Sequence, residues 1–362
     1  MTAEFKTAGH SRIKEQLVRA LENERLGHAY LFSGEAGVGK FSMALEFATA
    51  YLCKSENKPC MKCESCVSIK KYNNPHFQYV FPLKLEANLR KEDDFTRGGW
   101  EYISEKTRER INEPYLLLTD YSAPIYVGRI RDMNDAILSG RGQKTATIID
   151  GIDTLSAISL NTMLKTLEEP PSGALIILLA RFSVLPTVRS RCIVYKFGAV
   201  SGEEVRKWLK TKAAQKSDGE ISYLAQVSQN NPGAALQNLS QNATLLQKFT
   251  TDFADIVFME KSDFKRMINL EKFTNNLGRN FDLAQQILIF FLSQIRAAFL
   301  YAANFSDKAP EVYIPNFKNF EQASLTCEAI DKSILSIKRS SPLSMAFADL
   351  TIKLTEIFDE RK

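Results

Sequence analysis

The segment GEAGVGK, residues 34–40, could bind a phosphate group because it matches the pattern G-x-x-x-x-G-K. In such loops the glycines let backbone N–H groups face the phosphate, and the lysine supplies a positive charge for its oxygens. The next residue normally holds Mg²⁺ through a hydroxyl group, but here it is Phe41. Ser42 cannot simply replace it, because one helical step turns a side chain by about 100°. The candidate nucleotide-binding residues of this loop are Gly34, Gly37, Gly39 and Lys40.

A second candidate site residue is Asp150, at the end of the apolar run TATIID. In P-loop ATPases an acid at this place holds Mg²⁺. Hydrolases of this design usually continue with a glutamate that orients the attacking water, whereas this chain has Gly151. We expect Asp153 to cap the N-terminus of the following helix. Since the metal ligand and the water-orienting acid are both missing, the sequence predicts a nucleotide site with little or no hydrolysis, or a glycine-rich turn that binds nothing.

Four of the six cysteines follow one another with the spacing C-x₆-C-x₂-C-x₂-C. In a reducing compartment such a cluster indicates a metal site rather than disulfides. Four thiolates can close a tetrahedron around Zn²⁺, and with all four positions filled the site would be structural. The iron–sulfur run C-x₂-C-x₂-C-x₃-C-P has a different spacing. The predicted zinc ligands are Cys53, Cys60, Cys63 and Cys66, with free buried thiols as the alternative.

Arg191 lies in the tripeptide SRC, directly before a predicted strand. An arginine at such a domain edge is usually a surface or salt-bridge residue. Its guanidinium group could instead reach the γ-phosphate of a nucleotide on a neighbouring subunit, as an arginine finger does. The tripeptide alone leaves both interpretations open.

Composition is that of a soluble globular protein. The 362 residues are 44% hydrophobic and 25% charged, and the net charge of +5 is only weak support for contact with nucleic acid. The N-terminal segment is too polar for a secretory signal. The most apolar run, 285–303, contains Gln294 and Arg296, and its longest uninterrupted apolar stretch, 287–292, is far shorter than the roughly 20 residues of a membrane span. We therefore expect a buried helix and a cytoplasmic protein without a membrane partner.

Short apolar runs alternate with helical patterns in the first half of the chain, which predicts a parallel α/β sheet covered on both faces. The loop with Lys40 lies between the first strand and a helix at 41–53, the context that a phosphate loop requires. Residues 83–120 are charged and irregular, and we expect an insertion with short helices. Another helix is predicted at 127–138, and the patterns after Phe197 are helical. The predicted strands are 28–34, 74–82, 144–150, 174–180 and 192–197.

Several of these pieces occur together in one known family. The run HAYLFSG before the phosphate loop, the four-cysteine module, NPHF, MLKTLEEPP, SRC and PGAAL follow one another in this order. The chain thereby resembles the bacterial clamp loader AAA+ subunits, over residues 8 to about 240. The resemblance implies a P-loop AAA+ domain at 1–197, with the zinc module at 53–66 and the insertion at about 83–120. It also implies a helical lid domain at 198–245 and an all-α collar domain at 246–362.

Within that family the chain is most similar to the delta-prime class, which is expected to act as a stator that does not hydrolyse ATP. The motor class, gamma/tau, would carry intact metal and acid motifs, an arginine where this chain has Leu236, and a polar residue where it has Ala180-Arg181-Phe182. The resemblance implies that Arg191 is offered to ATP on a neighbouring motor subunit. It also implies a hetero-pentameric ring with gamma/tau and delta subunits, which acts on a sliding clamp and primer–template DNA during replication.

Two other functions stay open on the sequence. The chain could be an active gamma/tau-like ATPase in which Ser42 or a water replaces the lost metal ligand. It could also be a zinc-bearing nucleic-acid-binding module with a relic ATPase fold, which predicts salt-sensitive DNA binding by the chain alone. By its resemblance the chain would form part of a DNA-directed DNA polymerase holoenzyme, but the chain itself is expected to lack ATPase activity. Lys40 keeps binding of ATP or ADP open.

Overall fold

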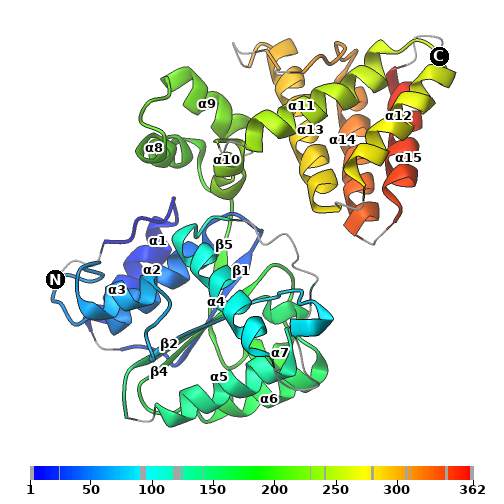
Figure 1. Cartoon of the computed structure of the whole chain (residues 1–362). Helices are drawn as coiled ribbons and strands as arrows, with labels where there is room; N and C mark the ends of the chain where they lie inside the picture. Colours follow the sequence, from blue (N-terminus) through cyan, green and yellow to red (C-terminus); the bar gives the residue numbers. More distant parts are fainter. Residues whose placement is uncertain are drawn as a thin grey trace. The chain divides into compact units, whose positions relative to one another are not determined.

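The computed structural model divides the chain into two compact units, which Figure 1 shows coloured along the sequence. The sheet unit comprises Met1–Trp208 with Asn231–Gly233, and the helical unit comprises Leu209–Asn230 with Ala234–Lys362. The structure describes residues 4–23, 25–89, 95–116, 123, 125–140, 142–228, 230–239, 242–278, 281–305, 309–310, 312–338 and 341–358.

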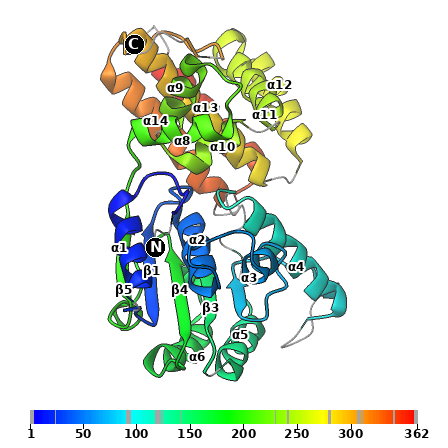
Figure 2. The ribbon, with the colours of Figure 1, turned by 90° about the vertical axis from the view of Figure 1, so that its left-hand side faces the viewer.

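Five parallel strands form one sheet in the order β2-β3-β4-β1-β5 (Figure 2). Because the strands are parallel, their carboxyl ends meet at one edge of the sheet, where Gly34 pairs with Phe197 and Asp150 pairs with Leu179. Ligands of open α/β sheets bind outside this edge. The predicted parallel α/β sheet is confirmed. The strands are β1 (Ala29–Gly34), β2 (Phe77–Val80), β3 (Thr145–Asp150), β4 (Ala174–Ala180) and β5 (Ile193–Phe197).

Helices cover both faces of the sheet because successive side chains of a strand point to opposite sides. On one face Ile148 lies in a core with residues of α1 (Ser11–Glu22), α2 (Lys40–Leu52) and α3 (Glu64–Lys70). On the other face its neighbour Ile149 lies in a core with residues of α5 (Val127–Ser139) and α6 (Ala157–Glu168). In Figure 1 the two sets of helices lie on opposite sides of the strands.

The insertion carries one long helix, α4 (Arg97–Asn112), and the 3₁₀ turn η1 (Ala87–Leu89), where the sequence predicted only short helices. The Thr96 side chain caps α4 by accepting a hydrogen bond from the backbone N–H of Gly99. Ile111 of α4 belongs to the same core as α2. The insertion is therefore anchored on the sheet unit, and its residues 90–94 and 117–120 lie outside the described residues.

The remaining elements of this half of the chain are short. A 3₁₀ turn, η2 (Ile152–Thr154), follows β3, and α7 (Pro186–Arg189) precedes β5. After Phe197, where the patterns are helical, the next elements are α8 (Gly202–Lys212), α9 (Asp218–Val227) and α10 (Pro232–Leu239).

The helical unit has an aromatic core of its own. Phe253 is fully buried and meets Phe291 and Phe347 edge-on, with ring centroids 5.3 and 5.1 Å away. By length and composition Leu283–Ala302 could cross a membrane, but 61% of its apolar window is buried inside the protein, as predicted for a core helix. The elements after α10 are α11 (Asn242–Ala254), the π-helical turn η3 (Asp255–Met259), α12 (Asp263–Leu277), α13 (Phe281–Ala302), α14 (Phe320–Lys338) and α15 (Leu343–Phe358).

Candidate functional site

The phosphate loop connects β1 to α2 and has the backbone that its glycines predict. Gly37 has φ of 80° and Gly39 has φ of 102°, which L side chains rarely adopt. A Cβ atom on Gly37 would also lie 2.2 Å from Oδ1 of Asn231. Gly39 is the N-cap residue of α2, so the amino end of this helix points at the loop.

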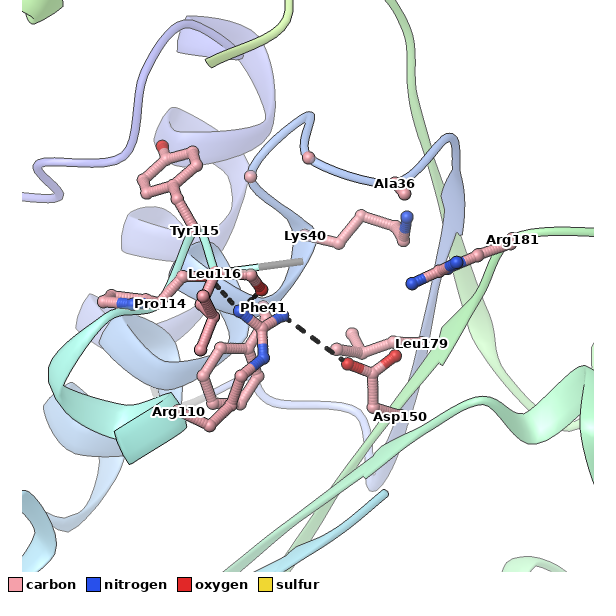
Figure 3. Close-up of a pocket in the computed structure, with 12 residues that line it drawn as sticks. Ala36, Lys40, Phe41, Arg110, Pro114, Tyr115, Leu116, Asp150, Leu179 and Arg181 are labelled. Atoms are coloured by element: carbon pink, nitrogen blue, oxygen red, sulfur yellow. Dashed lines mark hydrogen bonds and ion pairs between the residues drawn. The ribbon is translucent and has the colours of Figure 1, made fainter. Parts of the chain in front are cut away.

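The ammonium group of Lys40 contacts the phosphate loop itself. Its Nζ donates hydrogen bonds to the carbonyl oxygens of Gly34 at 2.6 Å and Glu35 at 2.5 Å. The side chain is buried, and Figure 3 shows it crossing the pocket under Ala36. Burial lowers the pKa of Lys40 to about 8, although the nearby carboxylate of Asp150 opposes this shift. The lysine therefore already has partners in this structure.

The metal position contains an aromatic ring. Phe41 is buried and packs against Tyr79, with ring centroids 4.5 Å apart. Ser42, which was one possible replacement for the lost hydroxyl, is buried and accepts a hydrogen bond from the Thr7 hydroxyl at 2.9 Å. The hydroxyl therefore contacts Thr7 in the protein interior, whereas the active-ATPase alternative would need it at the metal ion.

Asp150 ends β3 at the carboxyl edge of the sheet, as predicted. Its Oδ2 lies 3.8 Å from Nη2 of Arg110 and accepts a hydrogen bond from the Tyr79 hydroxyl at 3.4 Å. Both partners are buried, and burial beside the Asp150 carboxylate raises the pKa of Tyr79 well above its usual value. The carboxylate is thus paired within the chain.

Asp153 does not cap the following helix, so that prediction was wrong. Ser156 is the N-cap residue of α6, and its hydroxyl accepts from the N–H of Ser159. Oδ2 of Asp153 instead accepts hydrogen bonds from the backbone N–H groups of Arg181 at 3.2 Å and Phe182 at 2.9 Å. The 3₁₀ turn η2 separates β3 from α6, which moves Asp153 away from the start of the helix and ties it to the end of β4.

Several residues of the site were not predicted from the sequence, among them Arg110, Tyr115 and Asn231. Arg110 comes from α4 of the insertion, and Tyr115 follows that helix, with its hydroxyl 2.7 Å from the backbone N of Ala8, which donates to it. Nδ2 of Asn231 donates to the carbonyl oxygen of Ala36 at 2.7 Å. The only available signal was that Asn231 directly precedes the PGAAL motif.

Together these side chains leave little space at the phosphate loop. The cavity has a volume of about 30 Å³ and is lined, among others, by Lys40, Phe41, Arg110, Tyr115 and Asp150. Drug-sized ligands need pockets of about 300–1,000 Å³. In this conformation the cavity is therefore far too small for a nucleotide.

The four-cysteine cluster has the geometry of a tetrahedral metal site. The four sulfur atoms lie within 4.8 Å of one another, with Cys53–Cys63 at 3.9 Å and Cys60–Cys66 at 4.0 Å. Four sulfurs at the usual Zn–S distance would be about 3.8 Å apart, so this donor set fits Zn²⁺. Hydrogen bonds from the N–H groups of Lys62 and Cys63 lower the pKa of Cys60 to about 6, which favours the thiolate that a metal requires.

Arg191 of the SRC motif forms an ion pair with a glutamate of the MLKTLEEPP motif. Its Nη2 lies 2.5 Å from Oε1 of Glu168, the last residue of α6, and its Nη1 donates to the carbonyl oxygen of Thr187 at 2.6 Å. The arginine and glutamate side chains are 33% and 49% exposed. Arg191 does not line the phosphate-loop cavity described above.

Comparison with known proteins identifies the family of this chain. The family described as "DNA polymerase III, delta subunit" matches residues 9–201, more than half of the chain. The chain belongs to this family. The match covers β1 to β5 and includes the phosphate loop, the cysteine cluster, Asp150 and Arg191.

Curated relatives carry the names of two classes of DNA polymerase III subunit. DNA polymerase III subunit tau/gamma of Haemophilus influenzae is 29% identical over 231 residues, which are 62% of this chain and 28% of the relative. The delta' subunits of H. influenzae and Bacillus subtilis are 25% and 26% identical, over 60% and 51% of this chain and 57% and 46% of the relatives. The chain thus spans less than two thirds of each of these relatives. It is a member of the clamp loader subunit family of DNA polymerase III, as its motifs predicted.

Proposed function

We propose that this chain is a delta-prime-type clamp loader subunit, a stator that does not hydrolyse ATP. The observation that carries this proposal is the state of its phosphate loop. Phe41 stands in the metal position, Ser42 is bonded to Thr7, and Gly151 replaces the acid after Asp150. The chain therefore lacks the hydroxyl group that would hold Mg²⁺ and the acid that would orient the attacking water.

The active role of the chain would then be to provide Arg191 to a neighbouring motor subunit. The guanidinium of Arg191 would stabilise the charge that develops on the γ-phosphate of ATP bound there. Its pair with Glu168 supports this role because both partners are partly exposed, and exposed ion pairs contribute only about 0–1 kcal/mol. Exchanging the Glu168 carboxylate for a phosphate as the partner of Arg191 would therefore cost little free energy.

The substitution Arg191→Ala in the assembled loader tests this function. We expect hydrolysis at the adjoining nucleotide site to slow by about 10³-fold, with the chain still folded and incorporated into the complex. The measurement is clamp- and DNA-stimulated ATP turnover by the reconstituted complex. Arg189→Ala is the matched control, since Arg189 is an exposed arginine at the end of α7, two residues before Arg191. Wild-type turnover by the Arg191→Ala complex would refute the arginine-finger role.

The alternative is a gamma/tau-like motor ATPase, which the similarity to a tau/gamma subunit and the retained Lys40 favour. The buried, hydrogen-bonded state of Ser42 argues against it. Magnesium-dependent ATP turnover by the purified chain, lost in Lys40→Ala, would replace our proposal with this alternative.

The remaining assignments follow from the proposed function. The cysteine cluster would be a structural zinc module, and α11–α15 would form the collar that holds the ring of subunits. The lid at 198–245 and the boundaries 1–197 and 246–362 are part of the same proposal. Its partners would be gamma/tau and delta subunits, with the sliding clamp and primer–template DNA reached through the assembled complex in the cytoplasm.

A further inference from the structure

Arg110 is a buried cation in a place where the AAA+ resemblance leads one to expect a metal ion. Its side chain is 9% exposed, and that of its partner Asp150 is 8% exposed. Figure 3 shows the guanidinium group lying over the Phe41 ring with one end directed at the Asp150 carboxylate. The carbon of the guanidinium is 4.4 Å from the ring centroid, within the range of a cation–π contact.

Several further contacts hold the guanidinium in this position. Its Nη1 donates hydrogen bonds to the carbonyl oxygens of Pro114, at 2.9 Å, and of Leu116. These carbonyls belong to the segment that follows α4, so the insertion both supplies the arginine and orients it. A planar group with five donors can satisfy carbonyl oxygens at one end and face a carboxylate at the other.

The residues of the site do not fit a magnesium–nucleotide complex. Mg²⁺ would need oxygen ligands in octahedral geometry, and the position after Lys40 offers a phenyl ring instead. Asp150, the one acid that this family design would use, already faces Arg110. The Lys40 ammonium group is bonded to the loop carbonyls, and the remaining cavity is about 30 Å³.

We propose that Arg110 replaces the metal ion as a resident counter-cation of Asp150, and that the insertion closes the phosphate loop to Mg²⁺–nucleotide by carrying this arginine into it. The role of the insertion is then to provide, beside Asp150, the positive charge that a bound metal ion would otherwise provide. Phe41 is part of the same arrangement because it gives the guanidinium an aromatic face in place of a metal-binding hydroxyl. The loop keeps its glycines because the chain packs against them.

A nucleotide titration of the intact chain tests this proposal. We expect the wild-type chain to show no ATP binding up to about 1 mM, with or without Mg²⁺, by calorimetry. Arg110→Ala removes the cation and enlarges the cavity, and it should bind ATP with a Kd of about 1 mM or tighter. Arg108→Ala, an exposed arginine of the same helix, is the control and should behave like the wild type. ATP binding by the wild type, or none by a folded Arg110→Ala chain, would overturn the proposal.

A second measurement holds even if Arg110→Ala does not fold. Arg110→Met and Asp150→Leu each leave one buried charge without its partner, so each should lower the Tm. The double variant leaves neither charge, and we expect it to recover most of the loss. Additive losses would show that Arg110 is not the counter-cation of Asp150.

These outcomes are separate from those that test the proposed function. A wild-type chain that binds ATP without hydrolysing it would remove the resident-cation proposal and leave the stator function intact. A chain closed to ATP whose Arg191→Ala variant supports full turnover of the assembled loader would do the reverse.

Discussion

Lys40 explains why a phosphate loop can keep its lysine without using it on a ligand. The ammonium group bonds to two carbonyl oxygens of its own loop and lies close enough to Asp150 and Asp153 for both to favour its charged form. Arg110 and Arg181 oppose that form, and burial opposes it most. The protonated side chain thus holds two carbonyl groups of the loop together, but burying its charge costs free energy.

This cost predicts a rise in stability with pH. The pKa of Lys40 is about 8 in the folded chain against 10.5 ordinarily, so between these values the unfolded chain binds more protons and deprotonation favours the fold. Around pH 9 the free energy of unfolding should increase by about 1 kcal/mol per pH unit from this group. Urea unfolding at pH 7 to 9.5, followed by tryptophan fluorescence, measures the slope.

Lys40→Met provides the reference for that slope. Tyr79 and Tyr115 have raised pKa values because they are buried, and they act in the opposite direction at higher pH, when unfolded tyrosines ionise first. Both tyrosines are present in the variant, so the difference between the two chains isolates Lys40. Equal slopes in the wild type and the variant would show that Lys40 is not a buried, protonated group.

The residues of the site divide by sequence distance into those that could be predicted and those that could not. The loop glycines, Lys40 and Asp150 follow from local patterns, because strand, loop and helix are consecutive. Asn231 and Ala36 are hydrogen-bonded across 195 positions, and such a contact leaves no periodic signal. Arg110 was missed because a charged residue on a helix usually indicates a solvated face.

At the scale of elements, β1, β3 and β4 were predicted to within one residue at each end because each is a short, largely buried apolar run. The strand predicted at 74–82 was too long, since β2 covers only Phe77–Val80. Helix α4 was not predicted, for a physical reason. Its buried positions are Gly99, Ile103, Thr107, Arg110 and Ile111, so polar residues interrupt the apolar side of the helix in the sequence. An amphipathic pattern is visible only when the buried side chains are apolar. The function of a helix that buries a charge is therefore not visible from hydrophobic periodicity.

The cysteine module is an element whose stability we expect to depend on zinc. Cys53 follows α2, and Cys63 is the N-cap residue of α3, so one metal would fix the start of α3 against the end of α2. The purified chain should contain about one zinc per molecule, and chelation should lower the free energy of unfolding by about 2.7 kcal/mol when zinc is at 100 times its Kd. Metal analysis and urea unfolding with and without chelator measure both effects.

The cysteines outside the module provide the control for that experiment. Cys60→Ser should lose zinc and stability, because three thiolates cannot complete the tetrahedron. Cys192→Ser should keep its zinc, since Cys192 lies beside β5 and is not in the cluster. Equal zinc content in the two variants would show that the cluster is not a metal site.

At the scale of the whole molecule, each unit has its own buried core. The cores of the sheet unit contain residues from the strands and α1–α6, whereas the core of the helical unit contains residues from α11–α15 and η3. In the sequence, strand signals end near Phe197 and helical patterns continue, and the domain boundaries drawn at 197 and 245 stay a prediction. The contact boundary at Trp208 lies within α8, where the amphipathic pattern is continuous and gives no signal of a break.

Separate cores predict that the two units unfold separately. Both tryptophans, Trp100 and Trp208, belong to the sheet unit, so fluorescence reports that unit, while far-UV circular dichroism reports helices of both. Phe253→Ala should destabilise the helical unit by about 3–5 kcal/mol and move the circular dichroism transition while the fluorescence transition stays in place. Phe264→Ala, on an exposed position of α12, should change neither. A fluorescence transition that moves together with the circular dichroism would mean that the chain unfolds as one cooperative unit, since coincident probes are the signature of a two-state transition.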